Sequence, residues 1–297
     1  MNISELKTPI RIYWDLAPPG PGVPDPASIA GQIIDLKILS ADLTAQTADA
    51  ALLTVLERLA TGRIAVSLTL PVAGITPELL ADLAPLRLKQ LSVGLGAFAD
   101  MAAAVDGLLT SARQAGVSIG ISFPVTGGNY REIPQVAAFC VERGVPLVLP
   151  MQRLTAGEVA FRLSGAERRE LTEKLSGIEG RETVRVTIHD PFLWRAFYPE
   201  VQFPNGRCQA ANTMLHIAAD GEVHPCPTLP VSLGNLGRTT LAEIAVSAGK
   251  REVRERIMRT PAGCGLCADR ADCLGGCRGR GLFVTGSWDE PDPGCGV

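Results

Sequence analysis

The chain has 297 residues, which is enough for one large domain and a smaller one. A net charge of −3 and an aromatic content of 5% give neither a basic surface nor stacking platforms for bases, so we expect no nucleic-acid partner. No apolar run reaches the roughly 18–20 residues that span a bilayer, and the first residues lack a signal-peptide pattern, so we expect a cytoplasmic protein without membrane contacts.

The first two-thirds of the sequence alternates short strand-like runs with amphipathic stretches. The runs rich in β-branched and aliphatic residues predict strands at 10–16, 33–39, 63–70, 88–95, 117–125, 145–149 and 182–188. The amphipathic stretches predict helices at 49–59, 77–83, 100–115, 130–143 and 166–175. This alternation predicts an α/β fold with parallel strands and right-handed crossovers. The number of units favours a partial (β/α)6-type, TIM-like barrel, with an open doubly wound sheet as the alternative.

Several residues mark where the predicted helices begin and end. Thr76, followed by proline, is a helix N-cap signal, and Asn129 is expected to cap the helix that begins at residue 130. Gly116 and Gly144 stand where helix C-caps belong. These signals agree with the boundaries that the hydrophobic pattern gives.

The composition changes near residue 190. Residues 189–208 contain five aromatic residues and three prolines, which is typical of a linker or an interface between domains. We therefore predict a barrel domain at 1–190, and a linker with a small cysteine-rich domain at 191–297. In the second part, the Asp-Gly pair at 220–221 predicts a hairpin, and the Thr-x-x-Glu sequence at 240–243 predicts the start of a helix.

Seven of the eight cysteines lie at or beyond residue 208. Their spacing is Cys208-x12-Gly221-x4-Cys226, then Cys264-x2-Cys267-x5-Cys273-x3-Cys277, and finally Cys295. In a reducing compartment, such spacing indicates metal binding rather than disulfides, and thiolate ligands suit iron–sulfur clusters and zinc. Seven is one short of two four-cysteine sites, so the odd number requires an explanation.

This pattern resembles the seven-cysteine motif of the SPASM domain, and the segments DGEVHPCP, LGNL, CLGGCRG and PDPGC resemble its connecting segments. The SPASM domain is the C-terminal extension of many radical SAM enzymes that mature peptides, and the resemblance implies two [4Fe–4S] clusters. By similarity, the ligands of the first cluster are Cys208, Cys226 and Cys277. The ligands of the second cluster are Cys264, Cys267, Cys273 and Cys295.

On this reading, the three-cysteine cluster has one iron whose fourth ligand is open. His216 and His224 lie near Cys226 in the sequence and are candidates for that ligand. The alternative for each is an ordinary hydrogen-bonded histidine, because histidine is a rare cluster ligand. A water molecule or a group of a partner are the other candidates.

The strand predicted at 10–16 resembles the first strand of radical SAM barrels, which leads to a loop with the motif C-x3-C-x2-C. Here the loop reads APPGPGVPDPAS, and no cysteine precedes Cys140. The glycine-rich segment that follows the second strand in that family is also missing, since residues 40–43 read SADL. Three thiolates are needed to hold the SAM-cleaving cluster. We therefore expect a degenerate barrel that does not use S-adenosylmethionine.

Such a chain resembles the SPASM-domain component of the GeoRSP system, which is expected to accompany a separate radical SAM/SPASM enzyme. We expect an auxiliary iron–sulfur protein, without catalytic residues of its own, that acts in peptide or protein modification. Its partners would be that enzyme and a ribosomally made precursor peptide, and its clusters would relay electrons. The alternatives are an independent iron–sulfur enzyme that uses the open iron, and a zinc-binding structural module.

Three other features have ordinary structural interpretations. Cys140 lies on an apolar helical face and is expected to be a buried small hydrophobe. His189 and Asp190 form either an acid–base pair or a turn in which the aspartate caps the following helix, and Pro191 favours the cap. The basic segment 250–259 could dock an acidic partner, but its interspersed Glu252 and Glu255 favour a solvated helix face.

Overall fold

The computed structural model describes residues 6–18, 22–201, 208–267 and 269–295, with the backbone alone at 100–103. The strands of the N-terminal part are β1 (Arg11–Leu16), β2 (Ser40–Ala45), β3 (Ala65–Pro71), β4 (Gln90–Gly94), β5 (Ile119–Ser122), β6 (Leu147–Leu149) and β7 (Val186–Ile188). Its helices are α1 (Pro26–Asp35), α2 (Ala50–Ala60), α3 (Pro77–Leu83), α4 (Ala99–Ala115), α5 (Ile133–Arg143), α6 (Gly165–Ser176) and α7 (Pro191–Phe197).

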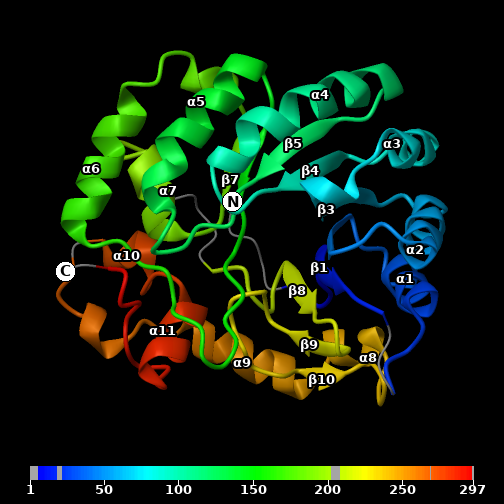
Figure 1. The fold of residues 1–297 in the computed structure, drawn as a ribbon. Helices are drawn as coiled ribbons and strands as arrows, with labels where there is room; N and C mark the ends of the chain where they lie inside the picture. Colours follow the sequence, from blue (N-terminus) through cyan, green and yellow to red (C-terminus); the bar gives the residue numbers. More distant parts are fainter. Residues whose placement is uncertain (1–5, 19–21, 202–207, 268, 296–297) are drawn as a thin grey trace.

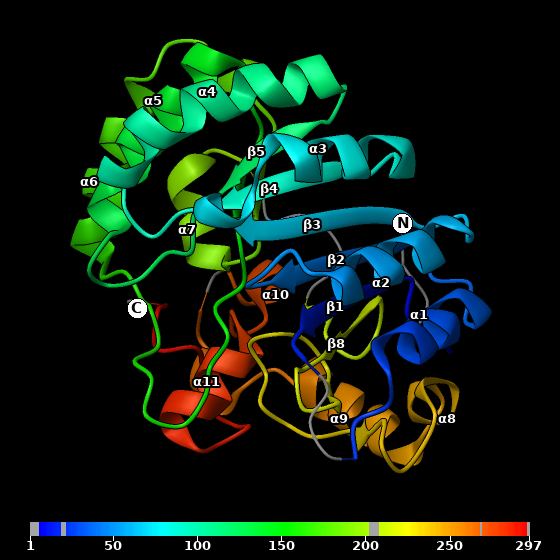
Figure 2. The ribbon, with the colours of Figure 1, turned by 45° about the vertical axis from the view of Figure 1, so that its right-hand side comes forward.

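The strands β1 to β7 lie side by side in chain order, and all pair in parallel. Because each right-handed crossover then moves in the same direction, the connecting helices fall on one face of the sheet, as Figures 1 and 2 show for α1–α5. A doubly wound sheet would reverse its strand order at a switch point. The predicted α/β partial barrel is therefore confirmed, and the doubly wound alternative is wrong.

The C-terminal part extends the same sheet. It contains the strands β8 (Met214–Ile217), β9 (Glu222–His224) and β10 (Gly234–Asn235), and the helices α8 (Leu241–Ala245), α9 (Ala248–Met258), α10 (Arg270–Cys273) and α11 (Arg278–Thr285). Strand β8 pairs in parallel with β1, whereas β9 and β10 add to it in antiparallel fashion. Figure 1 shows this segment packed beneath the barrel, with α10 and α11 below α6 and α7. Among the described residues, no helix is both long and apolar enough to cross a membrane.

One hydrophobic core connects the two parts. On β1, the side chains of Ile12 and Trp14 are buried, and they share this core with Leu215 and Ile217 of β8. The strand residues between them, such as Tyr13, point to the inner face of the curved sheet, because side chains alternate along a strand. The core therefore runs across residue 190, where we predicted the domain boundary.

The strand predicted at 33–39 is wrong, because residues 33–35 end α1 and residues 36–39 form the turn that leads to β2. Asp25 accepts a hydrogen bond from a backbone N–H of the first turn (3.2 Å), and Pro26 occupies the first helical position. The helix therefore starts before the apolar run, and Ile29 and Ile33 are buried at helical spacing. A short β-branched run alone does not separate a strand from the end of a buried helix.

Three of the four predicted caps are confirmed. The side chain of Thr76 accepts a hydrogen bond from the third residue of α3 (3.2 Å), and Gly116 and Gly144 end α4 and α5 in the left-handed conformation. Asn129 is the exception, because its side chain makes no cap bond. It accepts a hydrogen bond from the amide of Thr126 (2.7 Å) and donates to two loop carbonyls instead. The chain continues from it as a 3-10 turn before α5 begins.

Candidate metal centre

The seven C-terminal cysteines lie at the ends of short elements and in turns. They are Cys208 before β8, Cys226 after β9, Cys264 and Cys267 in the turn after α9, Cys273 at the end of α10, Cys277 at the start of α11, and Cys295 in the tail. No disulfide joins any of the chain's eight cysteines, all of which lie in the described residues. Because these elements are short, the chain reverses often and brings distant thiols together.

The first group of thiols comprises Cys208, Cys226 and Cys277. Burial raises the pKa of Cys226 well above its ordinary value, and the neighbouring thiols of Cys208 and Cys277 raise it further. Burial also raises the pKa of Cys277, to about 12, and Cys208 contributes to this rise. All three line a cavity of about 360 Å³ that extends to the carboxyl end of β7. These are the residues that the resemblance assigns to the first cluster.

The second group comprises the other four cysteines. Burial raises the pKa of Cys264, and Cys295 and Cys267 raise it further. The pKa of Cys273 is raised chiefly by burial, and also by Cys295 and Cys264. A second cavity, of about 320 Å³, is lined by Cys267, Cys273 and Cys295 together with residues of α6 and α7. The thiols that affect one another's pKa thus fall into one group of three and one group of four, and Cys273 borders both cavities.

Two glycines make this arrangement possible by reversing the chain between Cys273 and Cys277. Gly275 and Gly276 both have left-handed backbone angles, with φ of +91° and +71°. A Cβ atom on Gly275 would lie 2.6 Å from the ring of Pro261, and one on Gly276 would lie 2.7 Å from the Cβ of Asp292. Only glycine meets both requirements without strain.

The chemistry of the donor set fits an iron–sulfur centre. Thiolates are the usual ligands of [4Fe–4S] clusters, and a coordinated thiol loses its proton. Because burial raises the pKa values of these thiols, binding of a metal centre would displace protons from them. Among the described residues, no three or more His, Cys, Asp or Glu side chains converge as they would around one metal ion.

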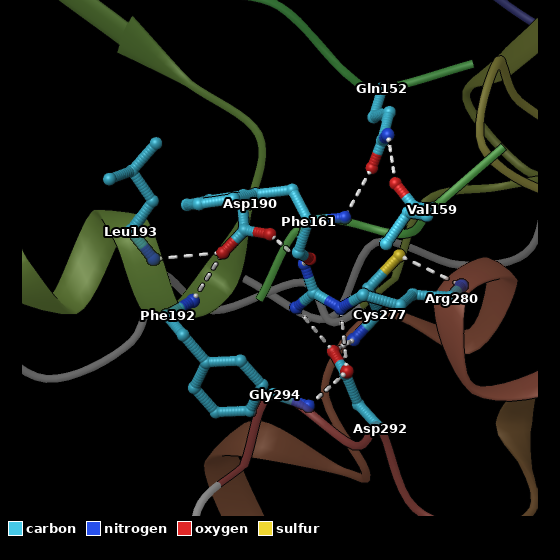
Figure 3. Close-up of polar contacts among 10 residues, drawn as sticks. All are labelled: Gln152, Val159, Phe161, Asp190, Phe192, Leu193, Cys277, Arg280, Asp292 and Gly294. Atoms are coloured by element: carbon cyan, nitrogen blue, oxygen red, sulfur yellow. Dashed lines mark hydrogen bonds and ion pairs between the residues drawn. The ribbon is translucent and has the colours of Figure 1, made fainter. Parts of the chain in front are cut away.

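A buried arginine connects the barrel to both thiol groups, and sequence reasoning missed it. Arg280 of α11 is 4% exposed and forms a two-pronged ion pair with Asp292, with 2.7 Å between Nε and Oδ1 and between Nη2 and Oδ2. Its Nη1 atom donates to the carbonyl of Phe161 (2.9 Å) and contacts the carboxylate of Asp190. Figure 3 shows the guanidinium between these three groups.

Asp292 in turn holds the two cysteine segments together. Its Oδ2 atom accepts a hydrogen bond from the backbone N–H of Cys277 (2.8 Å), and its Oδ1 atom accepts one from Gly294 (2.9 Å). Its carbonyl accepts a bond from the N–H of Cys295 (2.9 Å). Asp292 thus fixes the backbone at Cys277 through its carboxylate (Figure 3) and the backbone at Cys295 through its carbonyl. The only sequence signals were charged residues within the CRGR and PDPGC segments.

His189 and Asp190, which follow β7, do not form an acid–base pair. Asp190 caps α7 by accepting hydrogen bonds from the N–H groups of Phe192 (2.9 Å) and Leu193 (2.8 Å), so the cap interpretation is confirmed. His189 contacts the hydroxyl of Tyr13 across the barrel, at 3.4 Å from its Nε2 atom. Cys140 is fully buried in α5, as expected, and burial raises its pKa to about 12.

The two histidines that the sequence offered as a fourth ligand have other partners. His216 bonds through Nε2 to the Oδ2 atom of Asp15 (2.8 Å), and its ring stacks on that of His224. The Nδ1 atom of His224 lies 3.1 Å from the carbonyl oxygen of Val231. Neither histidine lines the cavities beside the thiols, so the ordinary hydrogen-bonded interpretation fits both.

After β1, where related barrels carry the cysteines of a SAM-cleaving cluster, this chain has an ion pair and a close backbone contact. At the end of β1, the carboxylate of Asp15 pairs with Arg153, which also lies 3.4 Å from the hydroxyl of Thr44 on β2. Beyond it, Gly22 approaches Gly237 so closely that a Cβ on Gly237 would overlap the carbonyl oxygen of Gly22. Gly22 thus packs against the segment that follows β10.

Comparison with known proteins identifies the cysteine region. Residues 208–273 match the SPASM family model, described as an iron–sulfur cluster-binding domain. The pre-heme d1 synthase of Dinoroseobacter shibae is 25% identical over 217 residues, or 62% of this chain and 53% of that protein. The AdoMet-dependent heme synthase of Methanosarcina barkeri is 33% identical over 92 residues, or 30% of this chain and 25% of that protein. The matches thus span about half and a quarter of these relatives.

The whole fold is also similar to solved structures. Streptococcus suis SuiB bound to precursor peptide SuiA has a TM-score of 0.74 at 17% identity, covering 99% of this chain and 77% of that one. Native anSMEcpe with bound AdoMet and the Cp18Cys peptide has a TM-score of 0.65 at 16% identity, covering 97% and 94%. The chain therefore carries a SPASM iron–sulfur domain on a fold shared with these proteins.

Proposed function

We propose that this protein is an auxiliary iron–sulfur protein that acts with a separate radical SAM enzyme in peptide or protein modification. The observation that carries the proposal is a contrast within one fold: seven thiols gather in groups of three and four, whereas the barrel has no cysteine before Cys140. In this proposal Cys208, Cys226 and Cys277 hold one [4Fe–4S] cluster. Cys264, Cys267, Cys273 and Cys295 hold a second.

The bound clusters would supply one-electron transfer, and the surrounding residues would position and shield them. Cys226 is 7% exposed and Cys264 is 8% exposed, so one thiol in each group is shielded from water, and the other five are partly exposed. Asp292 orders the backbone next to Cys277 and Cys295 through its hydrogen bonds. Hydrogen bonding and burial around the ligands are the means by which a protein tunes a cluster's potential.

The auxiliary role is inferred from the residues at the end of β1. A SAM-cleaving cluster needs thiolates there, and this chain instead pairs Asp15 with Arg153 and His216. The similar solved structures bind AdoMet or a precursor peptide, which supports a ribosomally made peptide as a partner. A separate radical SAM/SPASM enzyme as the other partner, the resemblance to the GeoRSP component and a cytoplasmic location belong to the proposal.

A second function has one observation in its favour. The cavity of about 360 Å³ places the three-cysteine group beside the carboxyl ends of the barrel strands, where barrel enzymes carry their active sites. An iron with an open position there would make this chain an enzyme by itself. The matches to two heme synthases agree with such a role, although they cover about half and a quarter of those proteins.

Metal analysis of the anaerobically purified chain tests the proposal. We expect about eight irons and eight sulfides per chain, the content of two [4Fe–4S] clusters. Stoichiometric zinc without iron would contradict both iron–sulfur functions and favour the structural zinc module.

Two further measurements separate the auxiliary protein from the enzyme. The reduced, cluster-loaded chain should not cleave S-adenosylmethionine, and it should be captured by a separately expressed radical SAM/SPASM enzyme. Turnover by the chain alone, without such association, would favour the independent enzyme. Reductive cleavage of S-adenosylmethionine would show that the interpretation of the β1 loop is wrong.

A further inference from the structure

The inner face of the barrel sheet is polar on strand after strand. Tyr13 of β1, Asp42 of β2, Ser67 of β3 and Ser92 of β4 all line one cavity, and Thr187 of β7 joins them from the far side. Their sequence neighbours on the opposite face are apolar and buried under the helices. Closed barrels of this type fill the interior with branched apolar side chains. This chain has put hydrogen-bonding groups there instead.

These groups surround a hollow of about 280 Å³. Pockets that hold small molecules begin at about 300 Å³ and are lined by a few convergent polar groups. Several of the lining groups are deeply buried, since Ser92 and Ser122 are each 3% exposed and Gln90 is 4% exposed. A carboxylate–guanidinium pair, Asp15 with Arg153, lies at the carboxyl ends of the first strands. The hollow adjoins the cavity of the three-cysteine group, since Pro150, Met151 and His189 line both, but none of the seven thiols lines the hollow itself.

The charges around the hollow do not balance. Arg11 lies 3.6 Å from the carboxylate of Asp42, so these two charges offset each other. Arg185 reaches across the lumen from the start of β7 to the neutral side chain of Gln90 on β4 (2.5 Å). Lys89 also lies near enough to Asp42 to lower the pKa of that carboxyl, so Arg11 and Lys89 share a single carboxylate. Among the described residues, no printed ion pair gives Arg185 a carboxylate partner. The lining thus carries an excess of positive charge.

The other lining groups add hydrogen bonds without adding charge. Burial lowers the pKa of His189 to about 4, so its imidazole is neutral at neutral pH. It lies against the hydroxyl of Tyr13, and Gln90 donates to Ser92 (2.9 Å). A partly enclosed site with excess positive charge and neutral polar walls favours an anion that also carries hydrogen-bonding groups.

We propose that this lumen binds a small polar molecule with a carboxylate or phosphate group, which pairs with Arg185 and Lys89. The remaining polar atoms of the ligand bond to the hydroxyl and amide groups on β1, β3 and β4. This site uses none of the seven thiols, so it stands whether or not the chain carries iron–sulfur clusters.

Titration calorimetry of the cluster-loaded chain tests this site, with succinate and inorganic phosphate as probes and uncharged succinamide as the neutral counterpart. We expect one of the two anions to bind one-to-one and succinamide not to bind. The anion that binds distinguishes a carboxylate ligand from a phosphate ligand. Arg185→Gln and Lys89→Gln should each weaken that binding about tenfold, the value of one charge-assisted hydrogen bond.

Arg63→Gln is the matched control. Arg63 is exposed and does not line the lumen, so the substitution removes the same charge elsewhere on the protein. It should leave the affinity unchanged. Arg185 and Lys89 are exposed as well, so all three variants should fold and their affinities can be compared directly. Absence of binding by both anions, or equal weakening by all three variants, would show that the hollow holds only water.

Discussion

Arg280 determines how the cysteine segments sit against the barrel. It is almost fully buried and pairs with Asp292 on one side and Asp190 on the other. Burial alone would lower its pKa, but these carboxylates raise it above the ordinary value, so the guanidinium stays charged. Removing one partner of a buried ion pair leaves an uncompensated charge, which costs about 3–5 kcal/mol.

We therefore predict that Arg280→Gln lowers the free energy of unfolding by several kcal/mol, on the order of a broken buried pair, and lowers the iron content. Arg280→Lys should restore charge but not the two-pronged geometry, so it should change the electron paramagnetic resonance spectrum of the reduced clusters. Arg143→Gln is the control, since Arg143 makes a similar pair with Asp106 at the surface. Equal effects of Arg280→Gln and Arg143→Gln on iron content would contradict the positioning role.

His189 predicts a pH dependence of stability. Its pKa falls from 6.5 to about 4 on folding, because burial disfavours the charged form. Between these values the unfolded chain takes up a proton that the folded chain does not. The free energy of unfolding should therefore fall as the pH is lowered from about 6.5 to about 4, by up to about 3 kcal/mol.

Denaturant unfolding at pH 7 and at pH 4.5 measures this effect. His189→Gln cannot take up the proton, so its stability should depend less on pH than that of the parent chain. The comparison isolates His189 from other titrating groups, such as His216, whose pKa is also lowered by burial. The same pH dependence in both proteins would show that His189 is not the cause.

The sequence predicted the cysteines of the site but not the residues that hold them in place. Cysteine spacing is visible in the sequence, whereas the division into two groups was what the resemblance to the SPASM domain implied. The partners of Arg280 lie 12 and 90 residues away, and only the fold reveals that its charge is buried. The hydrogen-bond partners of the candidate ligands His216 and His224 could not be predicted either, because Asp15 lies 201 residues from His216.

Among the elements, the short turn between α10 and α11 matters most for the site. Gly276 has a left-handed φ of +71°, and an added Cβ would lie 2.7 Å from Asp292 and 3.1 Å from the ring of Phe192. Gly286, which ends α11, has nearly the same φ of +70° but open space around it. Substitutions at these two glycines therefore distinguish the effect of backbone strain from that of steric overlap with Asp292.

We predict that Gly276→Ala lowers cluster content, because it displaces Asp292 and with it the bonds to the cysteine backbone. Gly286→Ala should cost only the backbone strain of about 1–2 kcal/mol and leave the iron content unchanged. Iron analysis together with thermal unfolding measures both effects. Equal iron loss in the two variants would mean that the turn's conformation alone, and not its packing against Asp292, supports the site.

The regular elements were predictable where the hydrophobic period was unambiguous. The helix α3 was predicted with its bounds, and the strands β3 to β7 were each found within or near the predicted runs. The error at 33–39 arose because a β-branched run there ends a helix that begins at Pro26. The parallel pairing of β8 with β1 joins residues about 200 positions apart, which no local pattern reports.

In the whole molecule, the two thiol groups line two cavities that have Cys273 in common. One cavity lies between the barrel end and the three-cysteine group, the other lies beside α6 and α7, and Cys273 borders both. If each group binds its own cluster, then removing one group should leave the other cluster in place. If the groups form a single unit, the loss should be complete in both cases.

We predict independent loading. The triple variant with Cys208, Cys226 and Cys277 changed to serine should retain about four irons, and so should the variant lacking the other four thiols. Cys140→Ser is the control for removal of a thiol, because Cys140 is buried in α5 far from either group in the sequence, and it should retain about eight. Iron and sulfide analysis after anaerobic reconstitution gives these numbers. Complete loss of iron from both multiple variants would overturn the three-plus-four assignment, because each cluster would then need ligands from both groups.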